Sequence, residues 1–331
     1  MVYRYRIATV FGGSGFIGRH LIRRLAKTGC IIRVPSRHPG TCTHLRTSGA
    51  VGQIVPMAVN IHDENSIAAC VQGVDLVINL VGILAPGGKG NSFEAVQAEA
   101  AGRIARVSKA AGVARLVHMS ALGADAGSAS AYARSKAEGE RLVLEAFPEA
   151  TIFRPSIVFG PEDGFFNRFG RMCQLSPVLP VIGGGTTRMQ PVYVGDVAEA
   201  IMVSLSTEAS KGRIFELGGP RTYSFKELLD ITRHETSRPR KPLLNVSWGM
   251  ASTLGGILEK LPGKPLTRDQ VEMLKTDNVV SGRHPGLAEL GVQPTTAEVI
   301  LPTYLDAYRV GGRFSEPSAN NPGKAAAQRR S

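Results

Sequence analysis

The sequence predicts an α/β fold in which a doubly wound parallel sheet is joined to a smaller C-terminal α/β lobe. The first observation behind this prediction is a glycine-rich loop at residues 12–18, between a short apolar run and an amphipathic helix. The second is an alternation of apolar runs and helical segments that continues to about residue 155. Such alternation is typical of parallel strands covered by helices on both faces.

Hydrophobic periodicity places the individual elements. The helix after the glycine loop carries Leu21, Ile22 and Leu25 on one face, and the strands are short, mainly apolar runs. We predict strands at 6–11, 31–34, 53–57, 75–80, 116–119, 151–154 and 191–194. We predict helices at 19–28, 93–111, 130–147, 196–205, 225–234 and 268–275.

The regular rhythm ends after residue 155, where glycines and prolines mark loops. We predict a first domain at 1–155, to which residues 190–220 return. The second lobe is expected at 156–189 and 221–314. Residues 315–331 are small, polar and basic, so we expect a disordered basic tail there.

Composition indicates a soluble cytoplasmic protein of bacterial type. The 331 residues are 43% hydrophobic and 20% charged, and no apolar run reaches the roughly 18–20 residues that span a bilayer. The glycine loop starts too close to Met1 to leave room for a cleavable leader. The four cysteines lack metal-binding spacing, so we expect free thiols in a reducing compartment and no metal site.

The net charge of +12 favours a negatively charged partner, and the kinds to consider are a nucleic acid, an acidic protein and an anionic membrane. Basic residues are scattered, aromatic residues are 6% of the chain, and no aromatic lies among the arginines as a base-stacking platform requires. We therefore expect no nucleic acid partner. An acidic protein or an anionic membrane surface fits the charge better.

The glycine loop predicts a Rossmann-type dinucleotide site. Gly12, Gly15 and Gly18 form GxxGxxG, in which the glycines allow a tight turn, close approach of a pyrophosphate and close packing of the helix on the sheet. The helix N-terminus then directs free N–H groups at the phosphates. The predicted cofactor contacts in this loop are Gly12, Ser14, Gly15, Phe16, Ile17 and Gly18.

The end of the second predicted strand indicates which dinucleotide binds. An NAD site places a carboxylate there to accept hydrogen bonds from the ribose 2′-hydroxyl, but this chain has Ser36 and Arg37 and no acid. Arg37 can pair with a 2′-phosphate while Ser36 donates a hydrogen bond to it. We therefore predict NADP(H); a solvated loop arginine is the alternative. Asp63 is expected either to approach the adenine or to cap the following helix, and Gly82 to allow close approach of the cofactor.

Tyr132 and Lys136 form a candidate proton-transfer pair. They stand four residues apart on a predicted helix, so their side chains face the same way. An ammonium beside a tyrosine favours the phenolate and lowers its pKa from about 10, which suits proton exchange near neutral pH. An ordinary tyrosine and lysine on a helix surface are the structural alternative.

Four motifs together resemble the extended and atypical short-chain dehydrogenases/reductases: GGSGFIG at 12–18, YARSK at 132–136, RPSIVFGPED at 154–163 and QPVYVGDVAEAI at 190–201. Two C-terminal segments, LTRDQVEMLKTDNVV at 266–280 and HPGLAELGVQPT at 284–295, are similar to the NAD(P)H-binding accessory subunit of respiratory complex I and its bacterial relatives. The resemblance implies Tyr132 as proton donor, Lys136 as its helper and Pro155 near the cofactor. It also implies a structural, non-catalytic cofactor and complex I subunits near the quinone module as partners.

The third catalytic residue of such enzymes, a serine, is out of register. The expected position falls on Ala121, with Ser120 one place early, and only twelve residues separate Ser120 from Tyr132. Losing an oxyanion donor costs about 3–4 kcal/mol of transition-state stabilisation. We favour a non-catalytic accessory subunit or assembly factor of complex I. The alternatives are an active NADP-dependent reductase or epimerase-like enzyme, for example in ubiquinone biosynthesis, and a redox-sensing regulator.

Residues 243–261 are largely apolar and include the chain's one tryptophan, Trp248. They predict either a core helix or an exposed amphipathic face. The preceding basic run at 238–241 favours contact with acidic lipid heads. The second interpretation places a peripheral membrane contact at 238–262, on the cytoplasmic face of the bacterial inner membrane.

Overall fold

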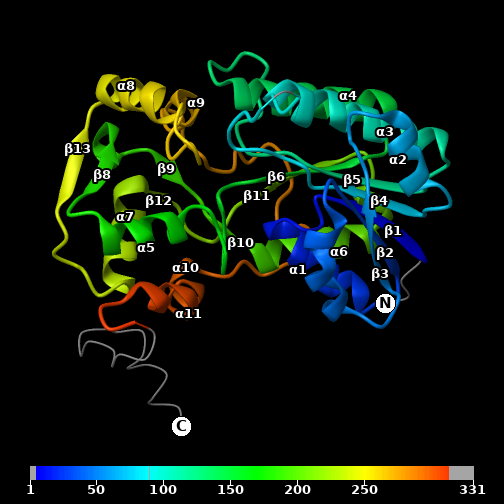
Figure 1. Ribbon diagram of the computed structural model, residues 1–331, viewed down its shortest axis with the longest axis horizontal. Coiled ribbons are helices and arrows are strands. Elements are labelled where there is room, and N and C mark those ends of the chain that lie inside the picture. Colours follow the sequence, from blue (N-terminus) through cyan, green and yellow to red (C-terminus); the bar gives the residue numbers. More distant parts are fainter. Residues whose placement is uncertain (1–4, 89, 313–331) are drawn as a thin grey trace, which may run out of the picture.

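A computed structural model describes residues 5–88 and 90–312. At its centre lies a parallel sheet of seven strands (Figure 1). The strands follow the spatial order β11 (Ile214–Leu217), β6 (Thr151–Pro155), β5 (Arg115–Met119), β4 (Leu76–Asn79), β1 (Ile7–Phe11), β2 (Ile31–Ser36) and β3 (Ile54–Ala58). The order reverses between β1 and β4, which is the switch point where ligands bind in open α/β sheets. The predicted doubly wound fold is confirmed.

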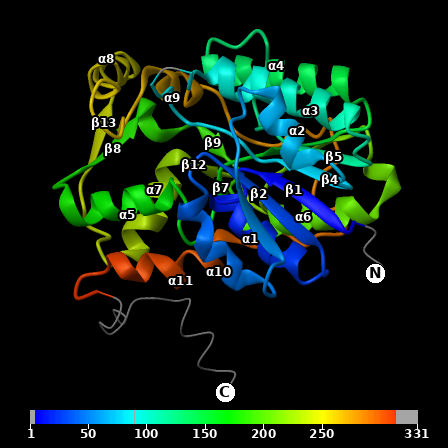
Figure 2. The same cartoon turned by 45° about the vertical axis from the view of Figure 1, so that its right-hand side comes forward.

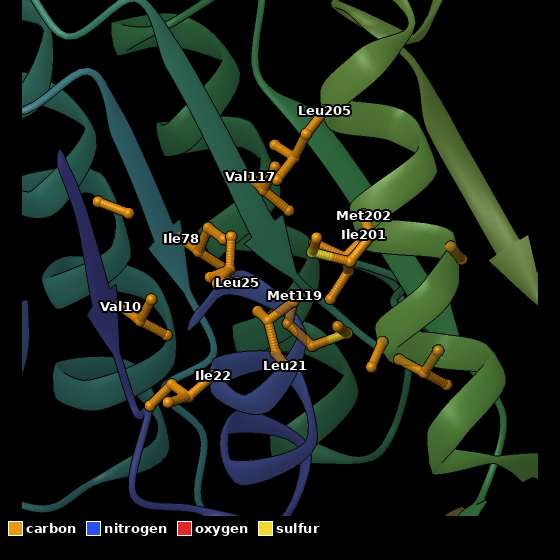
Figure 3. Close-up of a cluster of buried hydrophobic side chains, with 14 of the residues drawn as sticks. Val10, Leu21, Ile22, Leu25, Ile78, Val117, Met119, Ile201, Met202 and Leu205 are labelled. Atoms are coloured by element: carbon orange, nitrogen blue, oxygen red, sulfur yellow. The ribbon is translucent and has the colours of Figure 1, made fainter. Parts of the chain in front are cut away.

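Helices cover both faces of this sheet (Figures 1 and 2). One face carries α1 (Phe16–Ala26) and α6 (Val194–Ser206), and the other carries α2 (Glu64–Val71), α3 (Ala100–Ala110) and α4 (Ala131–Ala146). Figure 3 shows how the apolar side chains of α1 and α6 meet those of β1, β4 and β5. Burying each such side chain contributes about 1.5–3 kcal/mol, and this packing fixes the glycine loop between β1 and α1.

The second lobe has its own apolar core and three two-stranded pairs, β8–β13, β9–β12 and β7–β10. Its strands are β7 (Val158–Phe159), β8 (Leu179–Ile182), β9 (Arg188–Met189), β10 (Val192–Tyr193), β12 (Tyr223–Ser224) and β13 (Leu243–Val246). Its helices are α5 (Phe166–Leu175), α7 (Phe225–Glu235), α8 (Trp248–Leu258), α9 (Arg268–Met273), α10 (Ala297–Ile300) and α11 (Pro302–Leu305). The tail predicted at 315–331 lies outside the described residues.

Several element boundaries differ from the sequence prediction. Helix α1 starts at Phe16 and not at residue 19, because the chain enters the helix directly from Gly15. The helix predicted at 93–111 begins with a π-helical segment, Glu94–Glu99, before α3. The strand predicted at 191–194 forms β10, which pairs with β7 outside the central sheet, and the seventh strand of that sheet is β11.

The apolar segment at 243–261 is a strand and a helix joined at Ser247, whose hydroxyl caps α8 by accepting a hydrogen bond from the N–H of Met250. Helix α8 buries only Ala251 and two glycines. Its larger apolar side chains Met250, Leu254 and Ile257 are 57%, 42% and 60% exposed. The core-helix interpretation holds only in part: Val246 and Ala251 belong to the core of the second lobe, whereas α8 otherwise packs through its small residues and exposes its larger apolar ones. Across the described residues, the helices fall short of the length and apolarity that crossing a bilayer requires.

Candidate nucleotide-binding site

The glycine loop forms a backbone cradle at the switch point of the sheet. Gly12 has a φ of +74°, and a Cβ there would lie 2.9 Å from the backbone of Leu80. A Cβ on Gly18 would lie 2.5 Å from the carbonyl oxygens of Gly12 and Gly13. At Gly15 the nearest atom, the Gly12 carbonyl oxygen, is 3.1 Å away. Gly12 and Gly18 are thus required by the backbone itself, whereas Gly15 is exposed and leaves its outer side open.

The N-terminus of α1 is uncapped at this cradle. Gly15 is the N-cap residue and offers no side-chain acceptor, and the first turn, which contains Phe16 and Ile17, carries no acidic residue. The free N–H groups and the positive end of the helix dipole are therefore available to an external anion. Ser14 lies in the loop between Gly12 and Gly15. A dinucleotide pyrophosphate fits this arrangement.

The loop after β2, at the same edge of the sheet as the glycine cradle, carries the positively charged side chain of Arg37. Arg37 is exposed, and its guanidinium makes no hydrogen bond or ion pair with any described residue. The Ser36 hydroxyl oxygen accepts a hydrogen bond from the N–H of His38 at 3.1 Å, which leaves its own proton free to donate. No acid ends this strand, and Ser36 and Arg37 offer a hydrogen-bond donor and a positive charge at its end.

Asp63 takes the capping role. Its carboxylate accepts hydrogen bonds from the N–H groups of Asn65 at 3.1 Å and Ser66 at 3.2 Å, at the start of α2. Both carboxylate oxygens are engaged by the helix. Contact of Asp63 with the adenine stays a prediction, as does contact of Pro155, which ends β6 and whose carbonyl accepts a hydrogen bond from the N–H of Leu122 at 2.9 Å.

Tyr132 and Lys136 lie together on α4 and both are buried. The Lys136 ammonium donates to the carbonyl oxygen of Met119 at 3.1 Å and lies 6.0 Å from the centre of the Tyr132 ring. Burial lowers the pKa of Lys136 to about 8. Burial, with a smaller contribution from the Asp269 carboxylate, raises the pKa of Tyr132 to about 12. The expected lowering of the tyrosine pKa is wrong here, because loss of water disfavours the phenolate more than the ammonium favours it.

Asp269 of α9, in the second lobe, adds acceptors to the start of α4, whose N-cap residue is Ser130. Its carboxylate accepts hydrogen bonds from the Ser130 hydroxyl at 2.9 Å and from the N–H groups of Ala131 at 2.6 Å and Tyr132 at 3.2 Å. The Gln270 amide donates to the carbonyl oxygen of Leu84 at 3.2 Å. Helix α9 therefore closes over both the start of α4 and the loop that follows β4.

Helix α9 is in turn packed against α8. A Cβ on Gly255 would lie 3.0 Å from the backbone N of Arg268, and the Glu259 carboxylate accepts a hydrogen bond from that N–H at 3.2 Å. A Cβ on Gly256 would lie 2.3 Å from the Arg268 guanidinium. The two helices thus form one layer, which links the exposed apolar face of α8 to the candidate site.

Ser120 follows β5 directly and is 3% exposed. Its N–H donates to the carbonyl oxygen of Phe153 at 2.7 Å, and its hydroxyl has no hydrogen-bond partner among the described residues. The structure therefore places Ser120 inside the protein at the end of the strand. Its catalytic role stays a prediction.

Sequence reasoning missed two buried polar side chains of this region, Gln97 and His118, and the hydrogen bond by which Asn79 orients His118. The Asn79 amide oxygen accepts from the N–H of Val81, so its nitrogen is the donor to Nδ1 of His118 at 3.2 Å. His118 therefore carries its proton on Nε2. Burial, reinforced by the Lys136 charge, lowers the pKa of His118 to about 3 and keeps the ring neutral.

Three buried atoms of this region have no partner among the described residues: Gln97 Oε1, His118 Nε2 and Ser120 Oγ. Unpaired buried polar atoms are rare in folded proteins and call for a ligand or water. Gly82, at the rim, leaves this region open, because a Cβ there would meet only Gln97 Oε1 and Lys136 Nζ, each at 3.4 Å. The residues present therefore fit a polar ligand that extends from the glycine cradle toward Lys136.

Comparison with known proteins agrees with this geometry. A model of the NAD dependent epimerase/dehydratase family matches residues 8–218. The chain is 37% identical over 317 residues to NADH dehydrogenase (ubiquinone) 1 alpha subcomplex subunit 9 of Arabidopsis thaliana, covering 92% of this chain and 79% of the relative. It is 32% identical over 313 residues to the NADH-ubiquinone oxidoreductase 40 kDa subunit of Neurospora crassa, covering 94% and 82%.

Solved structures share the fold at lower identity. A dTDP-glucose 4,6-dehydratase of Streptomyces venezuelae with NAD bound superimposes with a TM-score of 0.69 at 20% identity, covering 91% of this chain and 96% of that one. An NADPH-dependent quinone oxidoreductase of Escherichia coli with NADPH bound has a TM-score of 0.67 at 18% identity, covering 90% and 98%. One of these folds holds NAD and the other NADPH, so the fold alone does not choose between the two dinucleotides.

Proposed function

Since the chain belongs to the NAD dependent epimerase/dehydratase family, and within it to the group of the complex I alpha subcomplex subunit 9 proteins, we propose that it is an NADP(H)-binding accessory subunit or assembly factor of NADH:quinone oxidoreductase. In this proposal the cofactor is held and is not turned over. The observation that carries the cofactor choice is the free guanidinium of Arg37 at the end of a strand that lacks an acid.

The closure of α9 over the tyrosine supports a cofactor that stays in place. Helix α9 bridges the segments around Tyr132, because the Gln270 amide donates to the carbonyl oxygen of Leu84 in the loop after β4 and the Asp269 carboxylate accepts from the N–H of Tyr132 on α4. In our proposal a carbonyl substrate would have to pass between these segments. The pKa of Tyr132, raised to about 12, also makes its hydroxyl a poor partner for proton exchange near neutral pH. The candidate site thus has the residues that hold a nucleotide, and in our proposal α9 restricts the path of a second substrate to Tyr132.

The exposed face of α8 supports a location at the membrane. Met250, Leu254 and Ile257 are spaced three to four residues apart on α8 and form one apolar stripe, with exposed fractions from 42% to 60%. The basic run at 238–241 lies before β13, at the end of that strand away from α8, and Arg238 and Lys241 donate to the backbone carbonyls of Thr236 and Cys173, so the apolar stripe alone supports this part of the proposal. In our proposal this surface rests on the cytoplasmic face of the bacterial inner membrane, near the quinone module, since ubiquinone is dissolved in the bilayer.

Native purification tests the assignment. We expect a tagged chain, expressed in its own host at natural levels, to comigrate with assembled NADH:quinone oxidoreductase and to release NADP(H) on acid extraction. Detection of the chain only in free fractions that contain no other complex subunit contradicts the proposal. Flotation with vesicles that contain anionic lipid tests the membrane face. Leu254→Gln with Ile257→Gln should lower binding, whereas Val51→Gln, at a fully exposed valine of the first domain, should not.

One observation favours the enzymatic alternative, namely the burial of Tyr132 and Lys136 side by side on α4. An NADP-dependent reductase would use them as proton donor and helper. Bound NADPH that is oxidised by a member of a panel of quinone and carbonyl compounds, and no longer oxidised after Tyr132→Phe, would establish this alternative and exclude a purely structural cofactor.

A further inference from the structure

The π-helical segment Glu94–Glu99 directs one polar side chain into the candidate site. A π-turn holds an extra residue and changes the direction of the side chains that follow, and such turns are frequent at functional sites. Gln97 lies in this segment and is 1% exposed. Phe93, just before it, packs edge-on against Tyr132 at 5.7 Å between ring centres. The segment is thus part of the wall around the Tyr132–Lys136 pair.

The hydrogen bonds of Gln97 fix the orientation of its amide. Its Nε2 donates to the Ser135 hydroxyl oxygen at 2.9 Å, and that hydroxyl donates its only proton to the carbonyl oxygen of Tyr132 at 2.8 Å. Rotating the amide by half a turn would set two acceptors against each other. Gln97 Oε1 must therefore point away from Ser135, and it has no partner among the described residues.

A donor and an acceptor meet over Gly82. The position that a Cβ would take there lies 3.4 Å from Gln97 Oε1 and 3.4 Å from Lys136 Nζ. Lys136 uses one N–H on Met119, and an ammonium has three. A ligand hydroxyl group that lies between these two atoms, outside van der Waals contact with Gly82, accepts from Lys136 and donates to Gln97 with a single oxygen. Sugar hydroxyls have this chemistry, whereas a phosphate oxygen offers Gln97 no proton.

We propose that Gln97 Oε1 accepts a hydrogen bond from a ribose hydroxyl in the nicotinamide half of the dinucleotide, while Lys136 donates to the same hydroxyl group. This assignment rests on the proposed nucleotide-binding function and adds to it a residue that recognises the far half of the molecule. The glycine cradle and Arg37 hold the adenosine half and the diphosphate. Gln97 makes the site distinguish a complete dinucleotide from its adenosine fragment.

Two ligands test the two halves of the dinucleotide site separately. NADPH occupies both halves, whereas 2′-phospho-ADP keeps the diphosphate and the 2′-phosphate but lacks the second ribose. Titration calorimetry of Gln97→Met should show about fivefold weaker NADPH binding, as expected for the loss of one hydrogen bond between two neutral groups. Binding of 2′-phospho-ADP should stay within about twofold. Equal weakening of both ligands, or no weakening of either, overturns the assignment.

Gly82→Ala is the second variant, and it leaves Gln97 in place. Its methyl group would occupy the point between Gln97 and Lys136 at ordinary contact distance, so the fold should persist while the hydroxyl is displaced. We expect the same selective loss of NADPH binding, with an unfolding temperature in the absence of ligand close to that of the wild type. Unchanged NADPH affinity in Gly82→Ala also overturns the assignment. Wild-type protein that binds neither ligand contradicts the proposed function itself, which is a different outcome.

Discussion

Replacing Arg37 with alanine removes the charge that we propose selects NADPH over NADH. The side chain is exposed and makes no ion pair with a described residue, so its loss should leave the unfolding temperature nearly unchanged. The substitution should weaken only the binding of the 2′-phosphate group. NADH, which lacks this group, serves as the internal reference ligand.

The magnitude follows from the exposure of the site. A hydrogen bond to a charged group contributes about 1.5–3 kcal/mol, and an exposed pair lies near the lower end. About 1.5 kcal/mol corresponds to roughly tenfold in Kd. We therefore expect Arg37→Ala to weaken NADPH about tenfold and to change NADH by less than twofold, as measured by titration calorimetry at a fixed salt concentration.

Arg23 provides the matched control. It is exposed, lies in the last turn of α1 at the end away from the cradle, and loses the same charge on conversion to alanine. At physiological ionic strength, charges farther apart than about 8 Å are largely screened, so Arg23→Ala should leave both affinities intact. Equal wild-type Kd values for NADPH and NADH, or an identical response of the two variants, would refute the role given to Arg37.

Three further substitutions test the framework. Gly18→Ala places a methyl group 2.5 Å from the Gly12 carbonyl oxygen and should abolish detectable NADPH binding in calorimetry, whereas Gly249→Ala, with nothing within 4 Å, should not. His118 stays neutral when folded and has an unfolded pKa near 6.5, so its contribution to stability is complete above that pH and is lost as pH falls toward 3. Between pH 7.5 and 5 the urea-derived stability of wild type should fall by about 2 kcal/mol more than that of His118→Gln, and parallel pH profiles contradict this. Asp269→Ala removes the carboxylate that accepts from the Ser130 hydroxyl and from the first two N–H groups of α4, and should lower the free energy of unfolding in urea by about 1–3 kcal/mol; a change below 0.5 kcal/mol, roughly the scatter for uninvolved surface sites, argues against it.

Local patterns predicted most of the central sheet. Six of its strands are apolar runs that periodicity identifies without any knowledge of neighbours. The seventh, β11, escaped prediction because Glu216 interrupts its apolar pattern and is 5% exposed. That carboxylate accepts hydrogen bonds from the N–H of Ser281 at 2.6 Å and from its hydroxyl at 3.0 Å. A buried acid becomes tolerable only through a partner 65 residues away, and the local sequence does not reveal such a partner.

Local sequence patterns also predict one part of the candidate site and not the other. The glycine loop, Arg37 and the Tyr132–Lys136 pair follow from spacing within a short stretch, and the structure gathers them along one edge of the sheet. Gln97 and Asp269 depend on contacts between distant segments, so no local pattern marks them. The direction of the tyrosine pKa shift was also out of reach, because burial determines it and burial is a property of the assembled fold.

The layer formed by α8 and α9 connects nucleotide binding at the candidate site with docking of a partner on the exposed face of α8. Asp269 anchors this layer to the first turn of α4, and α8 turns its apolar stripe outward on the other side. If α9 must move for the nucleotide to leave, a partner that binds the stripe on α8 slows that release, because α8 and α9 are packed together. Thermodynamic reciprocity then requires the occupied chain to dock more tightly than the empty one if docking slows release by stabilising the occupied state. A chain that has lost its coenzyme would accordingly bind its partner more weakly and detach from it. Whether the chain is found bound or free would then indicate whether it carries a nucleotide.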